Sequence, residues 1–259
     1  MIRTGLKYLL AIVFLAAFSA MLWTVYSHAR SVRHEITYQN IKIEYRDNYR
    51  FVSDKDITDA IRRSFGTFSG LRIDSLDLAS IERLVDNHSA VLKSEAWTTG
   101  DGILHISITQ RQPVMRFQMG GSGFYIDDRG FIFPLQKGHS AHVPVVDGNI
   151  PVKVWDGYKG MAGTAKERAW LSGMADLADY ISGSRTWQES IVQMTVNEDG
   201  DLVLIPRSGR ERFIFGTPGN AAAKFARMAD YYRYVKPSKE ENWYRTVNVK
   251  YNGQLICRK

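Results

Sequence analysis

The longest apolar segment of the chain lies at its amino terminus. No residue from Tyr8 to Tyr26 is charged, and a helix of about 20 residues is needed to cross a bilayer. A cleaved signal peptide has a shorter apolar core and a small residue three places before the cut, where this chain has Phe18. We therefore expect a transmembrane helix over residues 8–27, preceded by a short cytoplasmic segment at residues 1–7.

Cations flank this segment on both sides, with Arg3 and Lys7 before it and Arg30 and Arg33 after it. Positive charge favours the cytoplasmic side, so the two flanks compete. A long carboxyl-terminal domain crosses the membrane largely regardless of its charge. We therefore expect the amino terminus in the cytoplasm and the rest of the chain outside it.

Alternating and helical apolar spacings then predict a β-α-α-β-β module at residues 36–112. Alternation of apolar and polar residues is typical of half-buried strands, and apolar residues three and four places apart are typical of helices. Ser53 stands where a helix N-cap belongs. The predicted elements are a strand at 36–45, helices at 51–65 and 77–88, and strands at 90–99 and 103–111.

Pro113 opens a second region of mixed strands and helices at residues 113–259, so the predicted fold class is α+β. Asn252-Gly253 between alternating runs is a strong hairpin signal. The other expected elements are strands or hairpins at 114–119, 123–134, 142–148, 191–206 and 210–216, a helix at 164–182 and a helix starting at Pro218. The expected apolar faces of these helices are Ala169, Trp170, Met174, Leu177 and Ile181, and Ala221, Phe225, Met228 and Tyr232.

The stretch "GFYIDDRGFIFP" places Asp127 and Asp128 between two aromatic runs. The pair is either a catalytic acid pair or part of a turn. Aspartate bonds its own backbone and Gly130 supplies a positive φ, which is the chemistry of a hairpin loop. Catalytic carboxylates need two different environments, which adjacent loop residues do not offer. The sequence therefore favours a turn, and no catalytic residue is predicted.

Other candidate chemistry is weak. His139 and His142 lie in a loop with no third ligand near, and Cys257 is the one cysteine, so no metal site and no cofactor are predicted. The formal net charge of +7 is scattered, whereas a nucleic-acid binder concentrates its cations in a stripe. We therefore expect neither nucleic acid nor a small-molecule substrate as a ligand, and a binding or scaffolding role is favoured.

The order of four motifs resembles the bacterial cell-division family FtsQ/DivIB over nearly the whole chain. The motifs are "ITQRQPVMRF", "FYIDDRGFIFP", "FIFGTPGNAAAKFARMADYY" with its central Lys224, and "TVNVKYNGQLICRK". The resemblance implies a POTRA module at 36–112 and an FtsQ-type β-domain at 113–259. It also implies a single-pass type II protein of the inner membrane, with its main domains periplasmic and located at the division septum.

In function, the resemblance implies an essential, non-catalytic divisome scaffold. Such a protein recruits small single-pass coiled-coil division proteins of the FtsB/FtsL type, contacts other divisome components and helps to control septal peptidoglycan synthesis. The implied partner-binding residues are Tyr244, Arg245, Thr246, Val247, Asn248, Val249, Lys250 and Tyr251, with Tyr231 and Tyr234 of the preceding helix.

An exposed strand edge accepts a partner strand through its backbone groups. We expect this addition along the Arg245–Lys250 edge, with Val247 and Val249 packed inward. Two alternatives remain open. One is a POTRA-containing envelope assembly factor that receives extended polypeptides. The other is a secreted hydrolase, which a substrate-sized pocket with convergent polar groups would support.

Overall fold

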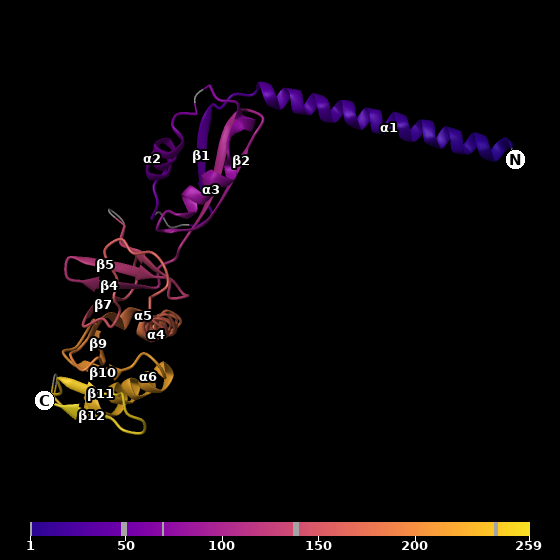
Figure 1. Ribbon diagram of the computed structural model, residues 1–259. Helices are drawn as coiled ribbons and strands as arrows, with labels where there is room; N and C mark the ends of the chain where they lie inside the picture. Colours follow the sequence, from indigo (N-terminus) through magenta and orange to yellow (C-terminus); the bar gives the residue numbers. More distant parts are fainter. Residues whose placement is uncertain (1, 48–50, 69, 137–139, 241–242) are drawn as a thin grey trace. The chain divides into compact units, whose positions relative to one another are not determined.

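The computed structural model describes residues 2–47, 51–68, 70–136, 140–240 and 243–259, and the side chains of residues 2–11 and 30–35 lie outside this description (Figure 1). The chain forms two compact units that meet in sequence between Gln110 and Arg111. We call the part of the first unit that follows the first helix the amino-terminal domain, and residues 111–259 the carboxyl-terminal domain. The α+β class is confirmed.

Helix α1 (Ile2–Glu35) is longer than the predicted 8–27 at both ends. Within it, Ile12–Ala29 is long and apolar enough to cross a membrane, and none of this window is buried. Large apolar side chains such as Phe14 and Trp23 are exposed along it, at 74% and 70%. By length and composition, α1 is the one helix of the described residues that meets this test. The cations that bear on orientation lie among the residues whose side chains are not described.

The amino-terminal domain has the predicted β-α-α-β-β order. Its elements are β1 (Asn40–Tyr45), α2 (Asp54–Phe65), the 3-10 turn η1 (Ile73–Ser75), α3 (Leu78–Asp86), β2 (Val91–Thr98) and β3 (Ile103–Gln110). The sheet order is β1-β3-β2, with β1 parallel and β2 antiparallel to the central β3. Ser53 caps α2 as expected, because its side chain accepts a hydrogen bond from the Asp56 N–H at 3.1 Å.

One apolar core holds this domain together. Leu104, Ile106 and Ile108 alternate along β3 and are fully buried. Helices α2 and α3 bury their apolar faces as well, at Ile57, Ile61, Ile81 and Val85. Period two in the strand and period 3.6 in the helices therefore give a helix-on-sheet sandwich.

The carboxyl-terminal domain is built on one nine-stranded sheet, in the order β12-β11-β10-β9-β8-β7-β4-β5-β6. Its strands are β4 (Met115–Met119), β5 (Ser122–Ile126), β6 (Ile132–Pro134), β7 (Val145–Gly148), β8 (Ile191–Val196), β9 (Leu202–Pro206), β10 (Arg212–Gly216), β11 (Thr246–Asn248) and β12 (Ile256–Arg258). Its helices are α4 (Ala165–Ser182), α5 (Arg185–Ser190) and α6 (Ala221–Asp230), followed by a π-helical turn η2 (Tyr231–Val235) and a 3-10 turn η3 (Lys236–Ser238).

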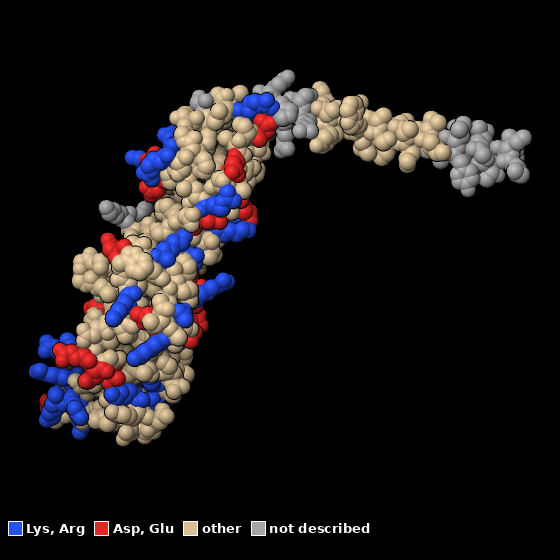
Figure 2. All heavy atoms as spheres, in the orientation of Figure 1, with Lys and Arg blue, Asp and Glu red and all other residues tan. Residues whose placement is uncertain are grey.

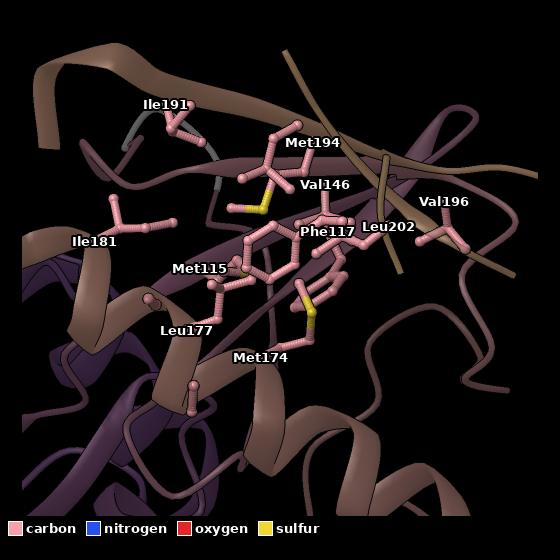
Figure 3. Packing of buried hydrophobic residues seen from close by; sticks show 14 of the residues in the cluster. Met115, Phe117, Val146, Met174, Leu177, Ile181, Ile191, Met194, Val196 and Leu202 are labelled. Carbon is pink, nitrogen blue, oxygen red and sulfur yellow. The ribbon is translucent and has the colours of Figure 1, made fainter. Parts of the chain in front are cut away.

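Helix α4 packs on the centre of this sheet. Figure 3 shows Met174 and Leu177 of α4 close to Phe117 of β4 and Val146 of β7. The predicted apolar stripe of α4 is partly wrong. Ala169 is exposed, whereas Leu171 is fully buried and Ala175 and Ala178 are nearly so. The buried face is therefore rotated from the predicted one and includes two small alanines.

Helix α6 begins at Ala221 rather than at Pro218. Asn220 has a φ of 58°, a left-handed conformation that an α-helix does not continue through. Phe225 and Met228 are buried as predicted, but Lys224 is buried too. Its Nζ donates to the Thr217 carbonyl oxygen at 2.6 Å and lies 4.7 Å from the centre of the Phe215 ring. Burial lowers the pKa of Lys224.

Candidate partner-binding site

The chain's own last strand covers the predicted docking edge. β11 is parallel to β10, with Val247 opposite Phe213, and antiparallel to β12, with Val247 opposite Cys257. Just before β11, Arg245 bonds to both neighbours, accepting from the Arg212 N–H at 2.8 Å and donating to the Arg258 carbonyl at 2.9 Å. The prediction of an open Arg245–Lys250 edge is therefore wrong. Among the described residues, the sheet ends at β12 instead.

The register shows which backbone groups of β12 point outward. The Val249 N–H donates to the Ile214 carbonyl of β10 at 3.0 Å, so by alternation Val247 also faces β10. Thr246 and Asn248 then face β12, opposite Arg258 and Ile256. Cys257 lies between those two residues, so its N–H and C=O point away from the sheet. These are the groups that an added strand would meet.

The opposite edge of the sheet is blunted. Strand β6 is bridged by Gly160, whose N–H and C=O both bond to Ile132, at 3.0 and 2.9 Å. Pro134, at the end of β6, has no N–H to offer. Of the two ends of this sheet, β12 is the one suited to pair with another chain.

The implied contact residues divide into core and surface groups. Val247 and Val249 are fully buried, which confirms the inward orientation predicted for them. Tyr244, Thr246, Asn248 and Lys250 are half-buried, and Arg245 and Tyr251 are exposed. The Lys250 side chain forms an ion pair inside its own domain, because its Nζ lies 2.6 Å from an Asp201 carboxylate oxygen. A partner can therefore contact only part of the predicted set.

The two tyrosines predicted from the preceding helix also differ in their exposure to solvent. Tyr231 is 3% exposed and packs edge-on against Phe213, with ring centres 5.5 Å apart. Burial, with the nearby Glu211 carboxylate, raises the pKa of Tyr231 to about 12. Tyr234 is 65% exposed. Tyr231 is thus a core residue that fixes the turn, and Tyr234 is the surface ring.

A buried ion pair holds the segment that carries Tyr234. Glu211 precedes β10 and is 2% exposed, and the Lys236 ammonium donates to its Oε1 at 2.8 Å. The same ammonium lies 5.1 Å from the centre of the Tyr232 ring. No sequence motif marks this pair, because its members lie far apart in the chain. It fixes η2 and η3 beside strand β10.

The Glu211 pair predicts a pH-dependent stability. Burial alone would raise the pKa of Glu211, but the hydrogen bond from Lys236 and its charge hold it below the ordinary value of 4.5. A depressed pKa stabilises the fold above about pH 4.5, and this contribution is lost as the pH falls through the folded-state pKa. Glu211→Gln should lower the free energy of unfolding by about 1.5–3 kcal/mol at pH 7, and by progressively less as the pH falls from 4.5 through the folded-state pKa. Urea unfolding over a pH series from 7 downward measures this difference. A loss that stays the same over the whole series would contradict the ion pair.

Several exposed cations lie on β12 and on the strands next to it. Figure 2 shows Lys and Arg side chains gathered at one end of the carboxyl-terminal domain, with some Asp and Glu side chains among them. Exposed Arg212, Arg245, Arg258 and Lys259 belong to this end. The Lys259 ammonium lies 3.6 Å from the centre of the Trp243 ring, which is 38% exposed. Trp243 was not among the predicted contact residues, although an exposed tryptophan beside an edge strand is a strong contact candidate.

The Asp127–Asp128 stretch is a turn, as predicted. The Gly130 N–H donates to the Asp127 carbonyl at 3.0 Å, and Gly130 has a φ of 72°. The two carboxylates nevertheless differ, since Asp128 is exposed and Asp127 is 4% exposed. Asp127 accepts from the Arg111 guanidinium at 2.8 Å and from the N–H groups of Arg129 and Phe131 at 3.0 and 2.9 Å. These contacts stabilise the turn, so Asp127 is a buried structural residue rather than a solvated loop aspartate.

The histidines form no ligand set in the part of the chain that the structure describes. No group of three or more His, Cys, Asp or Glu side chains there could hold a metal ion. His142 is exposed, and His139 lies outside the described residues. His105 stacks on Trp97, with ring centres 5.1 Å apart. These contacts are those of packing residues.

Comparison with known proteins gives two family matches. The family described as FtsQ/DivIB, C-terminal related, matches residues 112–258, and the POTRA-like domain matches residues 37–109. A search of the curated proteins found no match. The first match alone covers more than half of the chain, and the second covers the β-α-α-β-β domain. The chain therefore belongs to the FtsQ/DivIB family of non-catalytic cell-division proteins.

Proposed function

We propose that this protein is an essential divisome scaffold that recruits small coiled-coil division proteins of the FtsB/FtsL type by strand addition to β12. The observation that carries the proposal is the sheet end at β12, where Cys257 turns its backbone groups outward while the opposite edge is bridged and ends in proline. An added strand gains main-chain hydrogen bonds there. Family membership supports the divisome role.

The proposed contact surface extends from the edge to its exposed neighbours. Tyr234, Trp243 and Tyr251 offer partly exposed aromatic rings, and aromatic side chains are common anchors at interfaces. Main-chain pairing would supply affinity, and these rings would select the partner. Through the recruited proteins, the scaffold would help to control septal peptidoglycan synthesis.

The proposed organisation follows the membrane signal. Residues 8–27 of α1 would span the inner membrane, with residues 1–7 in the cytoplasm and the domains at 36–112 and 113–259 in the periplasm at the septum. The exposed apolar side chains of α1 support a membrane environment. This makes the protein a single-pass type II protein.

Depletion of the protein tests the proposal. A divisome scaffold is required for septation, so depleted cells should continue to grow as filaments without septa, and a wild-type copy should restore division. An envelope assembly factor that receives polypeptides through its POTRA-like domain would instead lose envelope proteins first. Normal division after complete depletion would reject the proposal, and so would loss of envelope proteins ahead of the division arrest.

A further inference from the structure

A groove of about 910 Å³ lies in the carboxyl-terminal domain, away from β12. It is lined by the carboxyl-terminal half of α4, the end of α5, the first residues of β7 and β8, and the segments 112–114 and 141–144. In the sheet order, β8 is separated from β12 by three strands. The groove is therefore a surface distinct from the proposed docking edge.

Small and apolar residues make the floor of this groove. Ala175 and Ala178 face it from α4, and their short side chains leave the space unfilled. Ile181 of α4 and Ile191 of β8 also line it, and both lie on the same side of the packed cluster (Figure 3). Such a floor favours an aliphatic occupant.

The rim of the groove is acidic, in a chain whose formal net charge is +7. Among the lining residues, Arg207 is the one lysine or arginine. Four exposed carboxylates line the rim, namely Asp128, Asp176, Asp179 and Glu189. Within the described residues, no ion pair joins any of the four to a cation. Asp176 and Asp179 lie one turn apart on α4, where like charges repel. The nearby carboxyl end of α4 adds further negative potential.

The carboxylates come from three separate elements around the groove: the β5–β6 turn, α4 and α5. One small cation cannot meet them all, and no metal-ligand group occurs in the described part of the chain. An extended chain with alternating cationic and aliphatic side chains meets both rim and floor, because successive side chains point to opposite faces. Lysine and arginine stems also cover apolar surface while their charges reach outward.

We propose that this groove is a second docking site, which binds an extended polypeptide segment with Lys or Arg alternating with aliphatic residues. Charge complementarity with the acidic rim selects the segment, and the apolar floor orients it. A scaffold with this groove and the β12 edge can hold two partners at once.

The test uses the full chain in neutral detergent and a rhodamine-labelled peptide, Lys-Val-Lys-Val-Lys-Val-Lys-amide, with binding followed by fluorescence anisotropy. The variant Asp176→Asn/Asp179→Asn/Glu189→Gln keeps side-chain volume and removes three rim charges. Its affinity should fall about tenfold, since exposed charge pairs contribute modestly each. The matched variant Asp156→Asn/Glu198→Gln/Asp199→Asn removes three exposed carboxylates elsewhere and should bind like the wild type.

Two further measurements separate shape from charge. Ser182→Trp places a large side chain at an exposed lining position of the groove. It should lower the affinity for the peptide about tenfold, although the net charge of the protein is unchanged. A peptide with Glu in place of Lys should not bind. Equal losses in the two triple variants, unchanged binding by Ser182→Trp, or binding of the acidic peptide would each overturn the proposal. A β12 variant that loses the division partners should still bind the peptide, so this test is independent of the proposed function.

Discussion

Replacing Cys257 with proline is expected to abolish copurification of the coiled-coil division proteins while the carboxyl-terminal domain stays folded. Cys257 turns its backbone N–H away from β11, so proline removes a donor that only a partner strand would use. The pyrrolidine ring also stands where that strand would lie. The lost hydrogen bond and the steric hindrance from the ring together should weaken partner binding by about tenfold or more.

The fold should tolerate this substitution for the same reason. Proline is accepted on edge strands where the N–H faces away from the sheet. The Cys257 side chain packs partly against the core, so Cys257→Ala is the matched control for the lost thiol. It should retain the partners. Copurification from cells, with circular dichroism of each variant, measures both effects.

Proline at Val247 would not test the same idea. The Val247 N–H faces β10, so proline there breaks an internal ladder bond next to a fully buried side chain. Partner loss in that variant would reflect local unfolding. Strand addition at β12 would be contradicted by full partner recovery with Cys257→Pro.

Local pattern predicted most of the fold. Alternation in residues 103–111 and helical spacing in residues 51–65 identified β3 and α2. An element that is buried on one face shows this in the spacing of its own apolar residues. The predictions failed where a distant neighbour decides the outcome. The buried face of α4 is set by the sheet it meets, so Ala169 is exposed where helical spacing alone suggested a core residue.

In the docking site, too, the local features were predicted and the features set by distant parts of the chain were not. Alternation placed Val247 and Val249 inward correctly, since side-chain direction is local. It could not show that β11 is paired on both sides, because its parallel neighbour β10 precedes α6 and its other neighbour follows a seven-residue connection at 249–255. Asn252-Gly253 correctly marked the turn between β11 and β12. The turn is not a two-residue hairpin, however, because pairing with β12 stops at Asn248 and Val249 bonds to β10 instead.

Buried charge was the least predictable feature. Glu211, Lys224 and Asp127 are each less than 5% exposed, although charged residues are seldom buried unless they are paired. Their partners are Lys236, the Thr217 carbonyl and Arg111. Only the folded chain brings these groups together, so no spacing rule could find them.

Asp127→Ala is the second large effect, and it separates the two neighbouring aspartates. Removing this carboxylate leaves the Arg111 guanidinium without its ion-pair partner, at a side-chain exposure of 11%, and frees the N–H groups of Arg129 and Phe131. Breaking a buried ion pair in this way costs about 3–5 kcal/mol, which lowers Tm by roughly 6–20 °C in a domain of this size. Asp128→Ala, one residue on and exposed, should change stability by less than about 0.5 kcal/mol. Thermal unfolding of the full chain in detergent compares the two single variants.

The double variant Arg111→Met/Asp127→Ala removes both charges and should recover part of the lost stability, since the unpaired guanidinium is the main penalty. Equal stability of the two single variants would mean that Asp127 is solvated and that the turn does not depend on its ion pair.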